Sequence, residues 1–385
     1  MGESNRARWL VIAESAWGTL PGTPTMEEIL RTGGSLTGDR NTIVSNAVRT
    51  TRMRNNVYSS GKTGKGSIEF ELSSGLLDTL LPGVCCSAWS SAITGAVSVT
   101  FDTTADTIHR AAGSFVSDGW VAGMHIYVSG AADSGNNGYA RVTAVTATDL
   151  SVDKNLTTQA VAASCVLRND GYIRNGTTAK SFSLEQGHLD QGHYYLWTGM
   201  RVGGFKLSLQ ANGLATGSLD LMGLYPTYSS STNASSVTAA VTTDAYNTAS
   251  EIGAFFEGGA TCPEDLTGFE IDLNNNLRNR PKLMSEAPAG IAYGVQDVTG
   301  TLSYYMGSSH TLANKVMNFT ESSAYVRFTN GSTDKTFIVT LPQYKYTGGV
   351  PPEAGGLDGD VTMKLPFRAY QGSGTYQIQF DRITP

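Results

Sequence analysis

Two short segments hold the residues with the clearest chemical potential. Gly61, Lys62 and Thr63 spell the end of a phosphate-binding loop. Such a loop also needs a glycine five places earlier, and it opens a helix. Asn56 stands at that earlier place, and the residues after Thr63 alternate in the manner of a strand. Turn glycines explain the motif better, so the sequence predicts neither a nucleotide nor another cofactor.

The second segment carries four possible metal ligands, namely Glu185, His188, Asp190 and His193. In a strand, His188 and Asp190 would share one face while His193 would point to the other. No two histidines stand at the helical spacing that is typical of zinc sites. A polar hairpin edge explains the cluster better, and the sequence predicts no metal site.

The sequence also gives no support for a reactive cysteine or for a hydrolytic active site. Cys85 and Cys86 are adjacent, which would strain a disulfide between them, and Cys165 and Cys262 stand alone. None has zinc-ligand spacing, so we expect buried free thiols in a reducing compartment. There is no GxSxG motif, and the acids are scattered along the polar faces of strands. The sequence therefore predicts no catalytic residues.

The composition indicates an all-β protein. The chain has 385 residues, of which 40% are hydrophobic and 16% charged, and it contains 44 glycines. This length suffices for one large or two medium domains, and the many turn formers favour strands over helices. The net charge of −6 argues against a protein whose overall surface binds nucleic acid. No apolar run is long enough to span a membrane, so we expect a soluble protein made in the cytoplasm, with no membrane partner.

A short phrase recurs along the chain: a threonine and a glycine, a strand of alternating apolar residues, and a closing glycine. Its copies lie at 215–223, 298–307, 63–72 and, more loosely, 359–365. A strand followed by an amphipathic helix also occurs twice, as 66–72 with 74–81 and as 300–306 with 309–319. We therefore predict an internal duplication, in which two related halves share one core and each contributes strands and a flanking helix.

The chain divides into three stretches. Residues 1–91 hold an extended N-terminal arm (1–38), a long polar loop (40–65) and the first strand and helix. Residues 92–169 are rich in Ala, Thr, Ser and Val and break into short strands, which predicts a small inserted β domain, placed on the outer surface. Residues 170–385 complete the parent domain.

The polar loop 40–65 concentrates positive charge. It contains no acid, and its cations are Arg40, Arg49, Arg52, Arg54, Lys62 and Lys65. These could neutralise phosphates, but Tyr58 is the only interleaved aromatic residue. Arginines also pair well with carboxylates of a neighbouring subunit. We predict that the six cations form a protein contact, either between subunits or between rings of subunits.

Several segments together resemble the tail tube proteins of long-tailed bacteriophages with non-contractile tails. They lie at 13–49, 197–209, 289–306, 341–352 and 363–370. Their order and spacing cover most of the chain except the insert. Within the insert, 107–130 is similar to a small β module found in various phage virion proteins.

The resemblance implies a tail tube β-sandwich of two packed sheets, assembled as rings that stack into a hollow tube. In such rings, one sheet of each subunit joins its neighbours' sheets into a continuous barrel around the lumen. We expect hexameric rings; hexamers of single folds and trimers of doubled folds both remain open. The implied partners are the chain itself, the tape measure protein, and the tail terminator and distal tail proteins. The implied location is the virion, with assembly in the host cytoplasm.

In a tail tube, double-stranded DNA must pass through the lumen without specific binding. A wall with net negative charge repels phosphates and avoids the counterion release that cations would drive. We predict that acids on the polar faces of strands face this lumen. The candidates are Glu69, Glu71, Asp220, Glu270 and Asp272.

A second class of function fits the modular insert and the Ser/Thr-rich loops. The chain could be a surface-exposed β-sandwich virion protein that serves adhesion or carbohydrate binding. A binder of this kind needs exposed aromatic residues beside polar groups, and Trp120 with Tyr127 is the one candidate pair. An enzyme is the third and weakest hypothesis.

Overall fold

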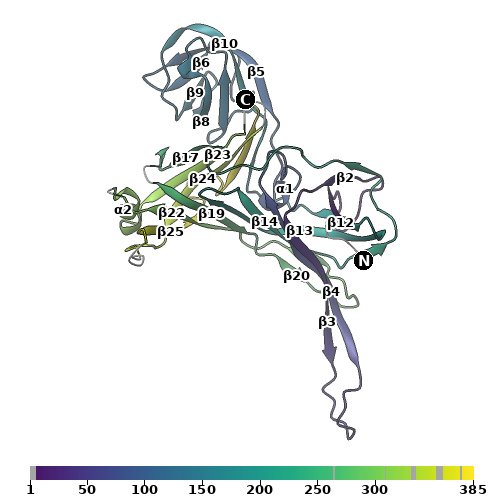
Figure 1. The fold of residues 1–385 in the computed structure, drawn as a ribbon. Coiled ribbons are helices and arrows are strands. Elements are labelled where there is room, and N and C mark those ends of the chain that lie inside the picture. The colour runs from purple at the N-terminus through teal and green to yellow at the C-terminus, as the bar shows by residue number, and fades with distance from the viewer. Residues whose placement is uncertain (1–5, 263–264, 308, 331–334, 353–358, 373–374) are drawn as a thin grey trace.

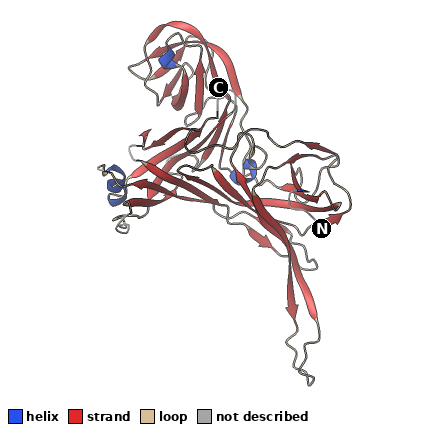
Figure 2. Cartoon of the chain, viewed as in Figure 1, coloured by secondary structure: helices blue, strands red, loops and turns tan. Residues whose placement is uncertain are grey.

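The structure is a computed structural model that describes residues 6–262, 265–307, 309–330, 335–352, 359–372 and 375–385. The regular secondary structure of this part of the chain is almost all strand, with two short α-helices (Figure 2). The predicted all-β class is confirmed. The elements are β1 (Ala7–Ala13), β2 (Thr25–Glu28), β3 (Gly33–Val44), β4 (Val57–Glu71), α1 (Leu81–Cys85), β5 (Ile93–Asp102), β6 (Thr107–Arg110), β7 (His125–Ser129), β8 (Gly138–Val145), β9 (Asp149–Val152), β10 (Gln159–Asn169), β11 (Tyr172–Arg174), β12 (Phe182–His188), β13 (His193–Gln210), β14 (Thr216–Gly223), β15 (Thr227–Ser229), β16 (Ser236–Thr238), β17 (Ile252–Glu257), β18 (Ala260–Thr261), β19 (Leu266–Asn274), β20 (Arg278–Arg280), β21 (Gly290–Ala292), β22 (Asp297–Tyr305), α2 (Thr311–Met317), β23 (Glu321–Phe328), β24 (Thr336–Tyr346), β25 (Thr362–Ala369) and β26 (Gln379–Ile383).

Two sets of six strands pair in the same order, and every pair is antiparallel. The first set runs β3–β4–β14–β13–β12–β1. The second runs β19–β22–β25–β24–β23–β17. The members also follow one another along the chain in the same order, with α1 after β4 and α2 after β22. The predicted internal duplication is therefore confirmed.

The duplication matches β4 with β22, as the paired strand and helix segments predicted. Three pairs of residues correspond, namely Gly66 with Gly300, Ile68 with Leu302, and Phe70 with Tyr304. The two clearest copies of the repeated phrase, 215–223 and 298–307, are not equivalent, because β14 corresponds to β25 and not to β22. Both β14 and β22 lie between two neighbours with one face buried, and this shared environment requires the same alternation.

The two halves join edge to edge into one central sheet (Figure 1). Strand β13 pairs with β19 from Gly204 opposite Asn274 to Gln210 opposite Gly268. The sheet order is thus β3–β4–β14–β13–β19–β22–β25–β24. Its apolar face packs against a second layer that contains β12 and β1 in one half and β23, β17 and β26 in the other. A single core results, in which stacked rings belong to both halves, such as Phe70 on Phe205 and Phe269 on Phe367.

The N-terminal stretch and the cationic stretch are strands, contrary to two predictions. Strand β1 pairs with β12 and buries Trp9, Leu10 and Val11, so it is not an extended arm. Strands β3 and β4 pair along their length and leave only 45–56 as a loop, so 40–65 is not a long loop. The far half of this hairpin projects from the body (Figure 1) and exposes Val57 and Tyr58. Because neither face is buried there, the sequence shows no alternation.

The two helices are shorter than predicted. The helix predicted over 74–81 is a run of turns, and α1 begins where that range ends. Pro82 lies in the first turn of α1, where its missing backbone N–H leaves no intrahelical hydrogen bond unmade, so it is compatible with the start of the helix. Helix α2 lies within its predicted range and buries Leu312, while Phe319 lies beyond its end and is 58% exposed.

Strands β5 to β10, from Ile93 to Asn169, form a closed barrel with its own core. Its first and last residues are paired with each other. The barrel lies against the second layer (Figure 1), through the apolar contact of Tyr127 and Tyr139 with Tyr325, Ile338 and Ile383 and through polar contacts. The His125 imidazole lies 3.0 Å from the Thr340 hydroxyl, and the Tyr139 hydroxyl lies 2.5 Å from that of Thr336. The barrel therefore sits on the side of the molecule away from the exposed face of the central sheet.

Candidate functional site on the polar face of the central sheet

The exposed face of the central sheet carries polar side chains in straight rows across the strands. The register places Glu71, Thr216, Ser208, Glu270 and Thr301 in one row. The next row holds Glu69, Ser218, Lys206, Asp272, Thr299 and Arg368. A third holds Ser67, Asp220, Gly204, Asn274 and Asp297. The structure thus brings all five predicted acids onto one face.

The intervening residues point the other way and are buried. Ile68, Leu219, Leu207, Ile271 and Leu302 are each at most 1% exposed. Because side chains alternate along a strand, the same sequence pattern that closes the core fixes which residues form the polar face. Burial of the core residues therefore also determines the exposed surface that the three rows form. We call this surface the polar face.

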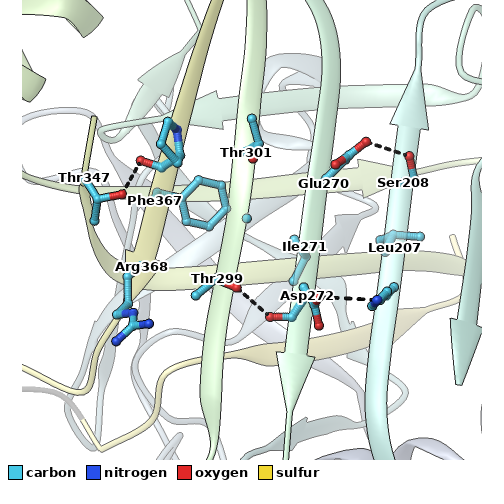
Figure 3. Close-up of a pocket in the computed structure, with 13 residues that line it drawn as sticks. Leu207, Ser208, Glu270, Ile271, Asp272, Thr299, Thr301, Thr347, Phe367 and Arg368 are labelled. Atoms are coloured by element: carbon cyan, nitrogen blue, oxygen red, sulfur yellow. Dashed lines mark hydrogen bonds and ion pairs between the residues drawn. The ribbon is translucent and has the colours of Figure 1, made fainter. Parts of the chain in front are cut away.

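A shallow hollow of about 840 Å³ marks the second half of the polar face, over β13, β19, β22 and β25. Figure 3 shows its side chains lying parallel on neighbouring strands. The Lys206 ammonium lies 3.6 Å from the Asp272 carboxylate, and the Ser208 hydroxyl donates to Glu270 at 3.4 Å. These contacts join β13 to β19, and so tie the two halves together. Of the described residues that line the hollow, none is a histidine or a cysteine, and the side chains do not converge on a point. The arrangement suits a wall better than a catalytic centre.

The polar face has mixed charge with an excess of acid. Asp39 and Asp297 join the five predicted acids, and the cations are Lys65, Lys206, Lys345, Lys364 and Arg368. Arg368 lies 4.0 Å from Asp297. Within the described part of the chain, the side chains of Glu69, Glu71 and Asp220 have no hydrogen-bonding or ion-pair partner. Alternation along β13 and β25 could have placed the missed cations on this face, because Lys206 and Arg368 sit at polar positions of those strands.

The six predicted contact cations separate into two groups. Arg49, Arg52 and Arg54 lie exposed in the loop 45–56 at the tip of the hairpin, and Arg40 is exposed on β3. Lys62 forms an ion pair with Glu286, and Lys65 lies 2.6 Å from Asp39. The hydrogen bond from Lys62 holds the pKa of Glu286 below its usual value. The two lysines are thus engaged within the chain.

The residues weighed for a metal site do not converge. The carboxylate of Glu185 is buried and accepts hydrogen bonds from Thr232 and Asn233, whereas His193 lies 2.7 Å from the Tyr228 hydroxyl. Among the described residues, no group of three or more His, Cys, Asp or Glu side chains is placed to hold a metal ion.

The aromatic pair weighed for carbohydrate binding is not an exposed cluster. Trp120 is 2% exposed, within the barrel core. Tyr127 packs edge-on against Tyr139, with ring centroids 4.8 Å apart. This candidate pair therefore does not supply the exposed aromatic cluster that the adhesion or carbohydrate-binding alternative requires, because Trp120 fills the interior of a small barrel.

Comparison with known proteins gives one result for nearly the whole chain. No curated protein matches the sequence. The sequence model of one family, described as phage tail tube protein, matches residues 4–369. No helix in the described residues has the length and apolar character needed to cross a membrane. The chain therefore belongs to the phage tail tube protein family, as a structural virion component that self-assembles into a tube.

Proposed function

We propose that copies of this chain close into rings whose lumen is lined by the polar face, and that these rings stack into the tube of a long, non-contractile tail. The junction between the halves supports this proposal. In the first half, β13 continues past β12, and its residues 204–210 hold β19. In the second half, β24 ends at Tyr346. The chain then follows β25 as the segment 347–352, where the Thr347 N–H donates to the Pro366 carbonyl at 2.8 Å. Among the described residues, no strand lies beside that segment on the corresponding edge.

Strand β3 is the counterpart of β19, and within the described residues it pairs only with β4. An unpaired strand edge invites another chain. We infer that β3 of one copy adds to segment 347–352 of the next, as β19 adds to β13 within one chain. Each chain supplies two four-stranded units to the central sheet, β3–β4–β14–β13 and β19–β22–β25–β24. A hexameric ring of six such units therefore contains three chains. The doubled fold thus favours the trimeric alternative over six chains.

The polar face supplies a wall that does not retain DNA. Its acids outnumber its cations, and Lys206 and Arg368 have carboxylates beside them. A cation that is already paired with a carboxylate displaces few counterions from DNA, so it contributes little to DNA binding. In this proposal Glu69, Glu71, Asp220, Glu270 and Asp272 face the lumen, and DNA passes to the host without specific contacts. Neither a cofactor nor a catalytic step takes part.

The exposed arginines at the hairpin tip form a contact between rings. Arg49, Arg52 and Arg54 project beyond the body with Val48, which is fully exposed, and Met53, which is 71% exposed (Figure 1). A tip of this kind can reach the next ring, where carboxylates pair with the guanidinium groups. Lys62 and Lys65 then stiffen the hairpin and do not touch the neighbour.

We propose that residues 92–169 are an inserted domain between 1–91 and 170–385, and that it lies on the outside of the tube. The pairing of Ile93 with Asn169 brings its two ends together, as an insertion requires. The barrel also rests on the second layer, on the side away from the polar face. The tape measure, tail terminator and distal tail proteins complete the set of partners, and assembly takes place in the host cytoplasm.

Electron microscopy of the purified chain tests this function. Rings or tubes of uniform bore are expected in negative stain, with three chains per ring by native mass spectrometry. A ring of six chains would overturn the assignment of two units per chain. A monodisperse monomer at high concentration that binds glycans on an array would overturn the tube itself.

A further inference from the structure

The second half has its own loop at the end of the sheet where the hairpin projects. This loop, 275–296, joins β19 to β22 and contains the short pair β20 and β21. It is the counterpart of the hairpin tip 45–56. At its end, Leu283 is 92% exposed and Met284 is fully exposed. Two adjacent large apolar side chains in water suggest a surface that is covered in an assembly.

The loop is held in place within the chain. Besides the ion pair between Lys62 and Glu286, the Lys62 N–H donates to the Glu286 carbonyl at 2.9 Å. Because this contact orders the loop before any partner arrives, binding through Leu283 and Met284 costs less conformational entropy.

An apolar pocket lies at the other end of the same strands. Its volume is about 250 Å³, and Leu209, Ile252, Phe255, Leu266 and Phe269 supply its apolar lining. The rings of Phe255 and Phe269 meet edge to face, with centroids 5.0 Å apart. This volume is below the roughly 300 to 1,000 Å³ that is typical of small-molecule sites. A pocket of this size suits one or two side chains.

Strand β19 links the two features. Gly268 and Phe269, near its start, line the pocket, while its last residue, Asn274, leads into the loop. A copy displaced along the strand direction therefore brings its loop toward the pocket of the copy before it. This is the direction in which rings stack if the polar face lines a lumen.

The charges around the two features are opposite. Arg278, Arg280 and Lys282 are exposed beside Leu283. Around the pocket, Glu251 precedes Ile252, Asp265 precedes Leu266, and the Glu270 carboxylate accepts a hydrogen bond from the pocket residue Gln210 at 3.2 Å. Opposite charges at a rim orient partners and suppress the reversed, head-to-head contact.

We propose that Leu283 and Met284 of one copy seat in the apolar pocket of the next copy along the tube, with the loop cations against Glu251, Asp265 and Glu270. The occupant is a second copy of this chain. The proposal rests on the stacking stated under the proposed function and adds to it a specific contact, separate from the hairpin tip. Each chain then meets the next ring through both of its halves.

Cysteine cross-linking in assembled tubes tests the contact directly. The variant carries Met284→Cys and Ala249→Cys in a Cys262→Ser background, since Ala249 lines the pocket and Cys262 is only partly buried. Oxidation should produce a ladder of linked chains on a non-reducing gel, with single-cysteine variants remaining monomeric. The matched control replaces Ala249→Cys by Val161→Cys, which is 81% exposed on the barrel, and should give no ladder.

A charge variant provides a second readout. Leu283→Asp with Met284→Asp should raise the concentration needed for tube growth at least about tenfold, whereas Val295→Asp, at an 81% exposed neighbouring site, should leave it unchanged. Tubes of normal bore from the cysteine pair without a ladder would overturn the contact and leave the tube function standing. Failure of the unaltered chain to form tubes would instead overturn the proposed stacking.

Discussion

Gly66 and Gly300 occupy the same position in the two halves and meet the same obstacle. A Cβ atom on Gly66 would lie 1.9 Å from the Ser35 carbonyl oxygen of β3, and one on Gly300 would lie 2.1 Å from the Glu270 carbonyl oxygen of β19. In each half, the strand that enters the sheet passes so close to its neighbour that no side chain fits. Glycine is therefore required at this position of the repeated phrase, because two backbones approach each other closely there.

Replacing Gly300 by alanine should destabilise the chain. The added Cβ meets the Glu270 carbonyl and, at 2.3 Å, the ring of Phe367, and the backbone cannot yield without disturbing the sheet. We expect a loss of about 1 to 3 kcal/mol in the free energy of unfolding, or failure to fold. Chemical denaturation measures it. Gly290→Ala, where a Cβ meets nothing within 4 Å, is the control, and equal stability of the two variants would contradict the argument.

The sequence predicts strands well where one face is buried. The alternation of Ile68, Phe70 and Leu72 marks β4 at the sheet, but the same strand is unmarked at Val57, where both faces meet solvent. Strand β1 fails for the opposite reason: Trp9, Leu10 and Val11 are all buried, so polar residues do not alternate with them. Alternation of apolar and polar residues identifies strands that have one buried face. It misses strands whose two faces are both exposed to solvent or both buried.

The same limit applies to the candidate site. Alternation alone placed Glu69 and Asp220 on a polar face, because their neighbours are core residues. It could not show that Lys206 stands opposite Asp272, since that pairing depends on the register between strands of different halves. Nor could it relate the loop 275–296 to the hairpin tip, because that relation appears only when the topology of both halves is known.

Stability should depend on pH through a buried carboxyl at the base of the barrel. Asp381 accepts hydrogen bonds from the Asn169 amide at 3.1 Å and the Gln379 amide at 2.6 Å, yet desolvation raises its pKa to about 6. The folded chain therefore binds a proton between about pH 4 and 6 that the unfolded chain has released. The contribution of Asp381 to stability accordingly falls as the pH rises through this window and stays low above it.

Asp381→Asn isolates this contribution. The stability of the variant minus that of the unaltered chain should increase by up to about 3 kcal/mol from pH 4 to pH 7. Nearby His125 acts in the opposite direction, because burial holds its pKa well below the usual value, so its contribution is lost as the pH falls. Comparing the two chains at each pH removes the histidine term. Thermal melts measure the difference, the exposed Asp102→Asn serves as the control, and a pH-independent difference would contradict the assignment.

Reversing charge on the polar face should make the tube retain DNA. Glu69→Lys, Glu71→Lys and Asp220→Lys replace three exposed acids that have no side-chain partner in the described chain, so the fold should persist. Each lysine that contacts a phosphate releases a counterion, and affinity should then fall steeply with salt. Genome ejection from virions carrying the variant should slow, and more so at low salt. Lysines placed at Val116, Ala160 and Val161, which are exposed on the barrel, are the control; equal slowing by both sets would contradict a lumen-facing polar face.

Charge reversal at the hairpin tip should stop growth of the tube without unfolding the chain. Arg49→Glu, Arg52→Glu and Arg54→Glu alter a loop that is exposed throughout and remote from the core, so circular dichroism and melting temperature should be unchanged. A single exposed ion pair contributes only about 0 to 1 kcal/mol, but every chain of a ring makes the contact, and the losses accumulate over the whole ring. Electron microscopy should show isolated rings. Arg→Lys at the same three positions keeps the charge and should preserve elongation if point charges suffice, or shorten the tubes if the planar guanidinium is required. Tubes of normal length from the glutamate variant would remove the tip from the contact between rings.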